Sequence, residues 1–152
     1  MREPLLPHPM RRRGRPGFSL IELLVALAIT GILAALAYPS FLEQIRKGRR
    51  SDATAALAGV MQAQERWRSS HPYYANNAQL TAAWPAGLGQ AAQSQAGYYA
   101  LAIGPAPSST HFTVTATAVP GSSQASDSAC TSMTLTFSAG TALYTPPACW
   151  PK

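Results

Sequence analysis

The sequence has 152 residues, of which 47% are hydrophobic and 12% are charged, and its formal net charge is +6. This length is enough for one domain with a modest core in addition to a membrane-spanning helix. Five of the twelve basic residues and one of the six acids lie before residue 18, and past Arg68 the only charged side chains are Asp127 and Lys152. The nearly uncharged distal region argues against nucleic acid as a partner without excluding it.

A basic cluster at residues 11–15 precedes a long apolar run. Residues 23–42 carry no formal charge, and twenty helical residues at about 1.5 Å each cover about 30 Å, one hydrocarbon thickness. The run is too long for an ordinary secretory signal peptide, and no small-residue cleavage site follows it. The sequence therefore predicts one membrane span. The arginines before it favour a cytoplasmic N-terminus, but the inference is weakened by four bases after it, Arg46, Lys47, Arg49 and Arg50.

Glu22 lies inside this apolar segment, five residues in when counting starts at Phe18. A carboxylate in lipid is normally paired or functional, unless it lies at the level of the headgroups. If the chain were cut between Gly17 and Phe18, the new amino group of Phe18 would be one helical turn from Glu22. An amine and a carboxylate on neighbouring subunits could then neutralise each other in apolar surroundings.

The stretch RPGFSLIELLVALAITGILAALAYPSF closely resembles the N-terminal signature of type IV prepilins and the related secretion pseudopilins. The resemblance is specific over roughly residues 14–50. It implies cleavage between Gly17 and Phe18 by a prepilin peptidase on the cytoplasmic face, N-methylation of Phe18, and an assembly role for Glu22. It also implies that the apolar helix first anchors the chain in the inner membrane and later packs in the core of a helical filament.

Gly31 and Pro39 interrupt the apolar helix. Glycine lowers helix propensity by about 1 kcal/mol, and proline removes a backbone hydrogen bond and kinks the axis. Transmembrane helices tolerate both residues, so their presence alone assigns no role. The resemblance implies that residues 31–39 are the segment that curves or unwinds when subunits pack.

Residues 43–68 continue the helix with an apolar stripe at spacings of three, four and seven, formed by Ala53, Ala56, Leu57, Val60, Met61 and Trp67. We expect Arg50 and other polar residues to point away from the core. Residues 69–96 form a long connection punctuated by proline, glycine and asparagine. We expect Tyr73, Tyr74, Leu80 and Trp84 to anchor this loop, and the resemblance implies that it contacts neighbouring subunits.

Residues 97–152 carry the pattern of an antiparallel sheet. Strands are predicted at residues 98–103, 111–119, 133–137 and 141–144, with a turn at Ala139–Gly140 before the last. A helix followed by strands predicts an α+β roll, in which the sheet packs on the amphipathic second half of the helix.

Cys130 and Cys149 are the only cysteines. If residues 18–152 project into the oxidising periplasm, the pair predicts one disulfide. Metal ligation is the poorer alternative, because no paired histidine spacing accompanies the sulfurs. The bridge resembles the C-terminal loop of type IV pilins more than that of secretion pseudopilins, which often use calcium there. The ending Cys149–Trp150 resembles minor pilins of the PilE type.

The sequence contains neither a Gly-x-Ser-x-Gly motif nor a phosphate-cradling glycine loop, so we predict a non-enzyme that needs no cofactor or metal. The resemblance implies a type IV pilus subunit, most simply a minor pilin supporting assembly, adhesion or twitching motility. A major pilin, a secretion pseudopilin and a DNA-uptake receptor pilin remain alternatives. Implied partners are other pilin subunits, the prepilin peptidase and methyltransferase, the inner-membrane assembly machinery and, before assembly, the lipid bilayer. The expected location is the inner membrane, with the C-terminal domain in the periplasm, and then the extracellular filament.

Overall fold

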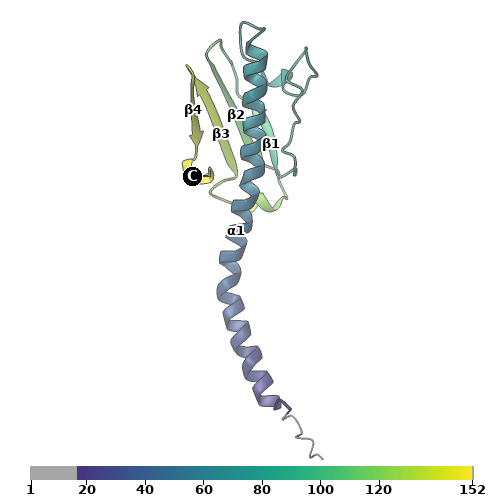
Figure 1. Cartoon of the computed structure of the whole chain (residues 1–152), viewed down its shortest axis with the longest axis vertical. Helices are drawn as coiled ribbons and strands as arrows, with labels where there is room; N and C mark the ends of the chain where they lie inside the picture. Colours follow the sequence, from purple (N-terminus) through teal and green to yellow (C-terminus); the bar gives the residue numbers. More distant parts are fainter. Residues whose placement is uncertain (1–16, 152) are drawn as a thin grey trace, which may run out of the picture. The chain divides into compact units, whose positions relative to one another are not determined.

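The computed structural model describes residues 17–151, so the predicted leader lies outside the described residues except for Gly17. Helix α1 (Leu20–Arg68) is followed by the strands β1 (Tyr99–Ile103), β2 (His111–Ala118), β3 (Ser132–Ser138) and β4 (Thr141–Thr145) (Figure 1). The chain divides inside α1 into two compact units, one up to Pro39 and one from Ser40.

The first unit is the apolar part of α1. Its large hydrophobic side chains are exposed, including Phe18 at 77%, Leu27 at 74% and Leu36 at 74%. This part of the helix is long and apolar enough to cross a membrane, and none of it is buried within the chain. A helix that is apolar all round must be covered by lipid or by other helices.

The second unit is one antiparallel sheet with the later part of α1 lying across one of its faces (Figure 1). The strands follow one another in chain order, and neighbouring residues pair across β2 and β3, as Phe112 with Phe137 and Val114 with Leu135. Ala139 and Gly140 both have positive φ, 48° and 85°, and join β3 to β4 in a two-residue hairpin turn. The predicted α+β roll is confirmed.

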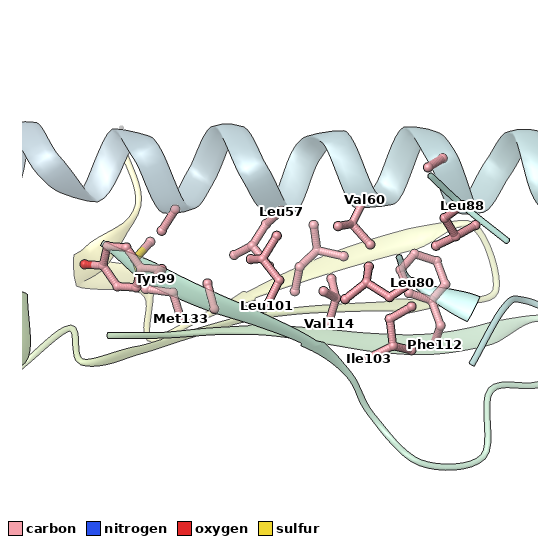
Figure 2. Close-up of a cluster of buried hydrophobic side chains, with 14 of the residues drawn as sticks. Leu57, Val60, Leu80, Leu88, Tyr99, Leu101, Ile103, Phe112, Val114 and Met133 are labelled. Carbon is pink, nitrogen blue, oxygen red and sulfur yellow. The ribbon is translucent and has the colours of Figure 1, made fainter. Parts of the chain in front are cut away.

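The core forms between the stripe on α1 and the inner face of β1, β2 and β3 (Figure 2). Ala53, Leu57, Val60 and Trp67 are buried, as the spacing of the stripe predicts, whereas Ala56 and Met61 are only partly buried. The sheet contributes alternate residues: Tyr99, Leu101 and Ile103 from β1, Phe112, Val114, Ala116 and Ala118 from β2, and Met133 and Leu135 from β3. No residue of β4 is buried, so the edge strand lies beside the core.

The long connection after α1 is ordered by its own hydrogen bonds. Leu88 N donates to Gln79 O at 2.8 Å, and Gln90 N donates to Leu80 O at 3.0 Å. Gly87 is required in this turn, because a Cβ there would lie 2.3 Å from Gln79 O. Tyr74 and Leu80 are buried as predicted, and Trp84, although 50% exposed, packs edge-on against Trp67 of α1 with ring centroids 6.2 Å apart. Tyr73 is 62% exposed, so the expectation that it anchors the loop is wrong. Leu88 fills the core position instead.

Candidate functional site

The predicted cleavage junction, Gly17–Phe18, lies immediately before α1 in a segment without regular structure. Ser19 starts the helix, because Glu22 N donates to Ser19 Oγ at 3.2 Å and Leu23 N donates to Ser19 O at 3.2 Å. Ser19 and Glu22 therefore occupy the first and last positions of a Ser-x-x-Glu capping pattern. Sequence reasoning missed this helix cap, although the four-residue pattern is its usual signal.

Glu22 lies in the first turn of α1, where the positive end of the helix dipole favours a carboxylate. It is the only formally charged residue between Phe18 and Leu42. The cap bond is made by the backbone N–H of Glu22, so it assigns no role to the carboxylate. The predicted pairing with the Phe18 amine of a neighbouring subunit stays a prediction.

Gly31 and Pro39 both lie inside α1, and the helix continues through them. A Cβ added at Gly31 would have no heavy atom within 4 Å apart from the neighbouring helix backbone, so nothing in the chain itself requires glycine there. The predicted deformation of this segment on packing stays a prediction.

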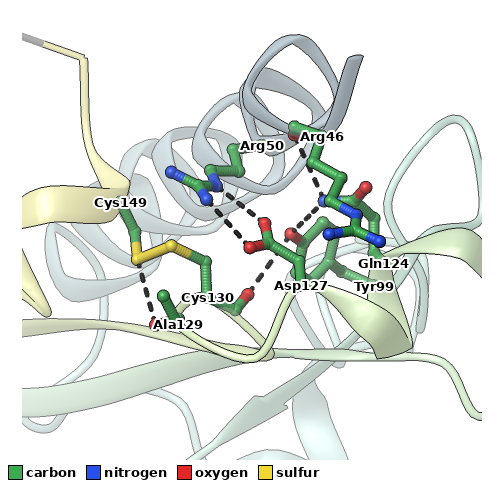
Figure 3. The surroundings of a disulfide bond; sticks show 8 residues. All are labelled: Arg46, Arg50, Tyr99, Gln124, Asp127, Ala129, Cys130 and Cys149. Atoms are coloured by element: carbon green, nitrogen blue, oxygen red, sulfur yellow. Dashed lines mark hydrogen bonds and ion pairs between the residues drawn. A yellow bond between two sulfur atoms is a disulfide. The ribbon is translucent and has the colours of Figure 1, made fainter. Parts of the chain in front are cut away.

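Asp127 holds the helix to the segment before the disulfide through Arg50 (Figure 3). Arg50 Nε donates to Asp127 Oδ2 at 2.7 Å and Arg50 Nη2 donates to Asp127 Oδ1 at 2.8 Å. The two side chains are 12% and 6% exposed, so this is a nearly buried, two-point ion pair. The hydrogen bond to Asp127 raises the pKa of Arg50, against the opposite effect of burial. The expectation that Arg50 points away from the core is wrong, because the only acid after Glu65 in the chain lies opposite it.

Two neighbouring arginines also reach the 3₁₀ turn η2 (Ser123–Ser126). Arg46 Nη2 donates to Ser126 Oγ at 3.3 Å, and Arg49 Nη1 donates to Ser123 Oγ. The Arg49 guanidinium also lies 5.0 Å from the centre of the Tyr98 ring, within cation–π range. No acid among residues 17–151 pairs with either arginine, so both add positive charge to this end of the second unit.

The predicted disulfide is confirmed: Cys130 and Cys149 are bonded, with their Cα atoms 5.7 Å apart (Figure 3). Both residues are buried, and Cys130 N donates to Asp127 O at 2.8 Å. The buried phenol of Tyr99 joins the same cluster, because it accepts a hydrogen bond from Gln124 Nε2 at 2.9 Å and donates to Cys130 O at 3.4 Å. Burial raises the pKa of Tyr99, which keeps this phenol protonated.

A second group of polar and aromatic side chains lies where α1 ends. The rings of Trp67 and His71 stack at 3.6 Å, and the Arg66 guanidinium lies 5.8 Å from the centre of the Trp84 ring. Trp67, His71 and Tyr73 contribute to an open cavity of about 340 Å³. Arg68 is held locally, because it donates to Ser109 O and His71 O.

Among residues 17–151, no three His, Cys, Asp or Glu side chains gather in a group that could hold a metal ion. The described side chains instead offer an apolar helical surface with one carboxylate, a disulfide-closed loop tied to the helix, and two surface groups of arginine with aromatic rings. These are features of assembly and binding.

Comparison with known families gives two matches. A model described as type IV minor pilin ComP, DNA uptake sequence receptor, matches residues 39–134, more than half of the chain. A second model, the prokaryotic N-terminal methylation motif, matches residues 12–38. The two matches adjoin, and together they include the apolar segment, the amphipathic part of α1 and most of the sheet.

Curated relatives are type IV pilins. The major pilin PilE1 of Neisseria gonorrhoeae is 31% identical over 87 residues, which is 57% of this chain and 38% of the relative. The major pilin PilA of Myxococcus xanthus is 39% identical over 60 residues, covering 40% of this chain and 27% of the relative. PilA4 of Thermus thermophilus, a type IV wide pilus major component, is 35% identical over 65 residues, covering 43% of this chain and 50% of the relative. The matched part thus spans half or less of the length of these relatives.

The methylation motif over the apolar segment, the minor-pilin match over the sheet domain and the observed helix-on-sheet fold all agree. The chain belongs to the type IV pilin family, whose members are structural subunits and not enzymes.

Proposed function

We propose that the protein is a minor pilin, which is cut between Gly17 and Phe18, methylated at Phe18 and assembled into a filament through α1. The observation that supports this most directly is the exposure of the whole apolar surface from Phe18 to Phe41. At about 25 cal/mol per Å², leaving so many large apolar side chains in water would cost far more than a domain's net stability. A bilayer first, and a bundle of identical helices later, would each cover it.

Glu22, the single carboxylate on this surface, would set the axial register between neighbouring subunits in the filament. An unpaired Glu22 inside a bundle of apolar helices would cost several kcal/mol, whereas the Phe18 amine of a neighbouring subunit would neutralise it. Cleavage at Gly17 is what would create that amine. The sheet domain, from residue 43 onward, would then lie in the periplasm before assembly and on the filament afterwards, because its disulfide needs an oxidising compartment.

The experiment compares Glu22→Gln with Glu43→Gln, which removes the same charge from an exposed position on the same helix. We expect cells carrying Glu22→Gln to cleave and methylate the chain normally but to incorporate it into sheared filaments at least tenfold less. Glu43→Gln should be incorporated as the unchanged chain is. Intact mass and N-terminal sequencing of the membrane and filament fractions measure both steps.

Equal incorporation of the two variants would refute the register role of Glu22. A chain that retains Met1 in cells with active prepilin peptidase would refute the pilin assignment. Copy number in the filaments separates the two pilin classes: a chain making up most of the filament mass would be a major pilin, and the minor role would be wrong.

A second candidate function is DNA binding during uptake, and it is favoured by the description of the family model that matches residues 39–134. The Arg66–Trp84 and Arg49–Tyr98 pairs are the surface chemistry that would contact phosphates and bases. Duplex binding by the full chain in detergent, measured between 50 and about 200 mM salt, tests it. Arg66→Gln should weaken binding to the same extent for duplexes of different sequence. If binding depends neither on the salt concentration nor on Arg66, the Arg66–Trp84 surface does not bind DNA.

A further inference from the structure

A cavity of about 360 Å³ lies between α1 and the C-terminal turn η3 (Pro147–Cys149), beside the disulfide. Lys47 and Arg50 line it from the helix, and Trp150 lines it from the C-terminal segment. Ala148 and Pro151 form apolar walls. The size is that of a small-ligand pocket.

The polar groups that remain available in this cavity are hydrogen-bond donors. Arg50 bonds to Asp127 through Nε and Nη2, so its Nη1 takes no part in that ion pair. The indole Nε1 of Trp150 is buried with no hydrogen-bond partner among the described residues. The Ser51 hydroxyl, which also lines the cavity, already donates to Gly48 O at 2.6 Å. Among residues 17–151, no carboxylate lines the cavity, so its chemistry suits an anion.

The nearby charges leave Lys47 free to bind such an anion. Its ammonium lies 3.5 Å from Glu43 Oε1, but both side chains are at least 50% exposed, and an exposed pair of this kind contributes at most about 1 kcal/mol. Asp127 is fully engaged by Arg50. Within the part of the chain that the structure describes, Arg46 and Arg49 bond to serine hydroxyls and not to acids, so both add positive charge near the cavity.

The position of the cavity in the chain indicates where the anion comes from. Lys47 follows Leu42, the last residue of the uncharged run, by five residues, about 7.5 Å along a helix. That is the depth of lipid headgroups, where lysine and arginine reach phosphates and where tryptophan and tyrosine are enriched. Tyr144 packs on Trp150 with ring centroids 4.6 Å apart, and the adjacent Leu143 is 63% exposed.

We propose that this cavity binds the phosphate of an anionic phospholipid and holds the sheet domain against the bilayer surface before the subunit enters a filament. Lys47, the free Nη1 of Arg50 and the Trp150 indole donate to the phosphate oxygens. The inference rests on the membrane-anchored stage of the proposed function. Release from the membrane would free the same surface for contact with neighbouring subunits.

The test uses the full chain in neutral detergent, titrated with dihexanoyl phosphatidylglycerol and followed by tryptophan emission. The Trp150→Phe variant gives the background emission of Trp67 and Trp84, so that the change due to Trp150 can be separated. We expect saturable binding that Lys47→Gln weakens roughly fivefold or more. Arg46→Gln is the matched control, because Arg46 precedes Lys47 in the chain but lies outside the cavity, and it should change the affinity less than twofold. Near-UV circular dichroism and the mass of the oxidised chain verify that each variant is folded.

Three control ligands distinguish the sources of phosphate. Dihexanoyl phosphatidylcholine should bind much more weakly, and equal binding would show that no anion site exists. Inorganic phosphate that binds as tightly as the lipid, or a duplex oligonucleotide that binds more tightly with the same dependence on Lys47, would overturn the lipid assignment. Equal losses of affinity in Lys47→Gln and Arg46→Gln would show that the anion is held by diffuse positive charge and not by this cavity. Because these readouts need no filament, their failure would leave the Glu22 experiment, and the proposed function, standing.

Discussion

Arg50 and Asp127 form a nearly buried ion pair that ties the middle of α1 to the segment leading into Cys130. The pair joins residues that are far apart in the chain, and it lies beside the Gln124–Tyr99 and Tyr99–Cys130 hydrogen bonds and the disulfide (Figure 3). Ala53 is the first residue of α1 that is buried in the apolar core. Before Ala53, the helix is held to this end of the sheet by the Arg50–Asp127 ion pair, next to the disulfide-closed loop.

Asp127→Asn should destabilise the protein by about 3 kcal/mol, because it leaves the Arg50 guanidinium nearly buried without its countercharge. Thermal unfolding of the full chain in detergent, followed by near-UV circular dichroism, measures the loss. Glu43→Gln is the control, since it removes one partner of an exposed pair and should cost less than about 1 kcal/mol. Similar effects of the two variants would show that burial of the Arg50–Asp127 pair has no energetic consequence.

The sequence predicts the strands well because alternating side chains and the Ala139–Gly140 turn are local signals. It predicts the partner of Arg50 poorly, because nothing local indicates that a lone aspartate after a long uncharged stretch faces the helix. The choice between the adjacent Tyr73 and Tyr74 is similar: the two have the same chemistry, and only the path of the loop decides that Tyr74 is buried. The burial of Gln64 was missed for the same reason, since its partner belongs to a loop.

Gln64 closes the loop after α1 onto the core. Its side chain is fully buried, its Nε2 donates to Ala75 O at 2.9 Å, and its Oε1 accepts from Ala75 N at 2.8 Å. Gln64→Leu keeps the volume but leaves both backbone groups of Ala75 unpaired, and should cost about 3 kcal/mol. Gln62→Leu, at an exposed position of the same helix, should be close to neutral. Hydrogen exchange at the Ala75 amide checks the local cause, and unchanged protection in Gln64→Leu would contradict it.

Tyr74 makes stability depend on pH in the alkaline range. Burial, together with the hydrogen bond that its Oη donates to Glu65 Oε1 at 2.8 Å, raises the pKa of Tyr74 to about 12 from its ordinary value of 10.0. The folded chain therefore holds the phenolic proton more tightly than the unfolded chain. Its contribution is fully present below pH 10 and is lost as the pH rises from about 10 to about 12.

Tyr74→Phe removes this titrating group, so the fall in unfolding temperature between pH 9.5 and about 11 should become shallower than in the unchanged chain. Tyr73→Phe is the matched control, because Tyr73 is largely exposed, and it should leave the alkaline slope as it was. If Tyr74→Phe and the unchanged chain lose stability in parallel as the pH rises, the pKa of Tyr74 is not raised in the folded state.

A substitution at Gly31 can distinguish an effect on the stability of the subunit from an effect on its assembly. A Cβ there would meet nothing within 4 Å in the chain, and alanine favours a helix interior by about 1 kcal/mol over glycine. Gly31→Ala should therefore leave the unfolding of the sheet domain unchanged in detergent. If residues 31–39 deform or approach a neighbouring helix closely on packing, the same variant should lower incorporation into filaments several-fold.

The control is Ala28→Ser, a small change on the same apolar helix that lowers the helix propensity by at most about 0.7 kcal/mol. Filament incorporation at equal membrane levels, measured by quantitative mass spectrometry of sheared and membrane fractions, is the readout. A loss with Gly31→Ala but not with Ala28→Ser would locate the requirement at the glycine backbone. Full incorporation of Gly31→Ala would show that the helix packs without deforming there, and would leave Pro39 as the remaining candidate for a bend.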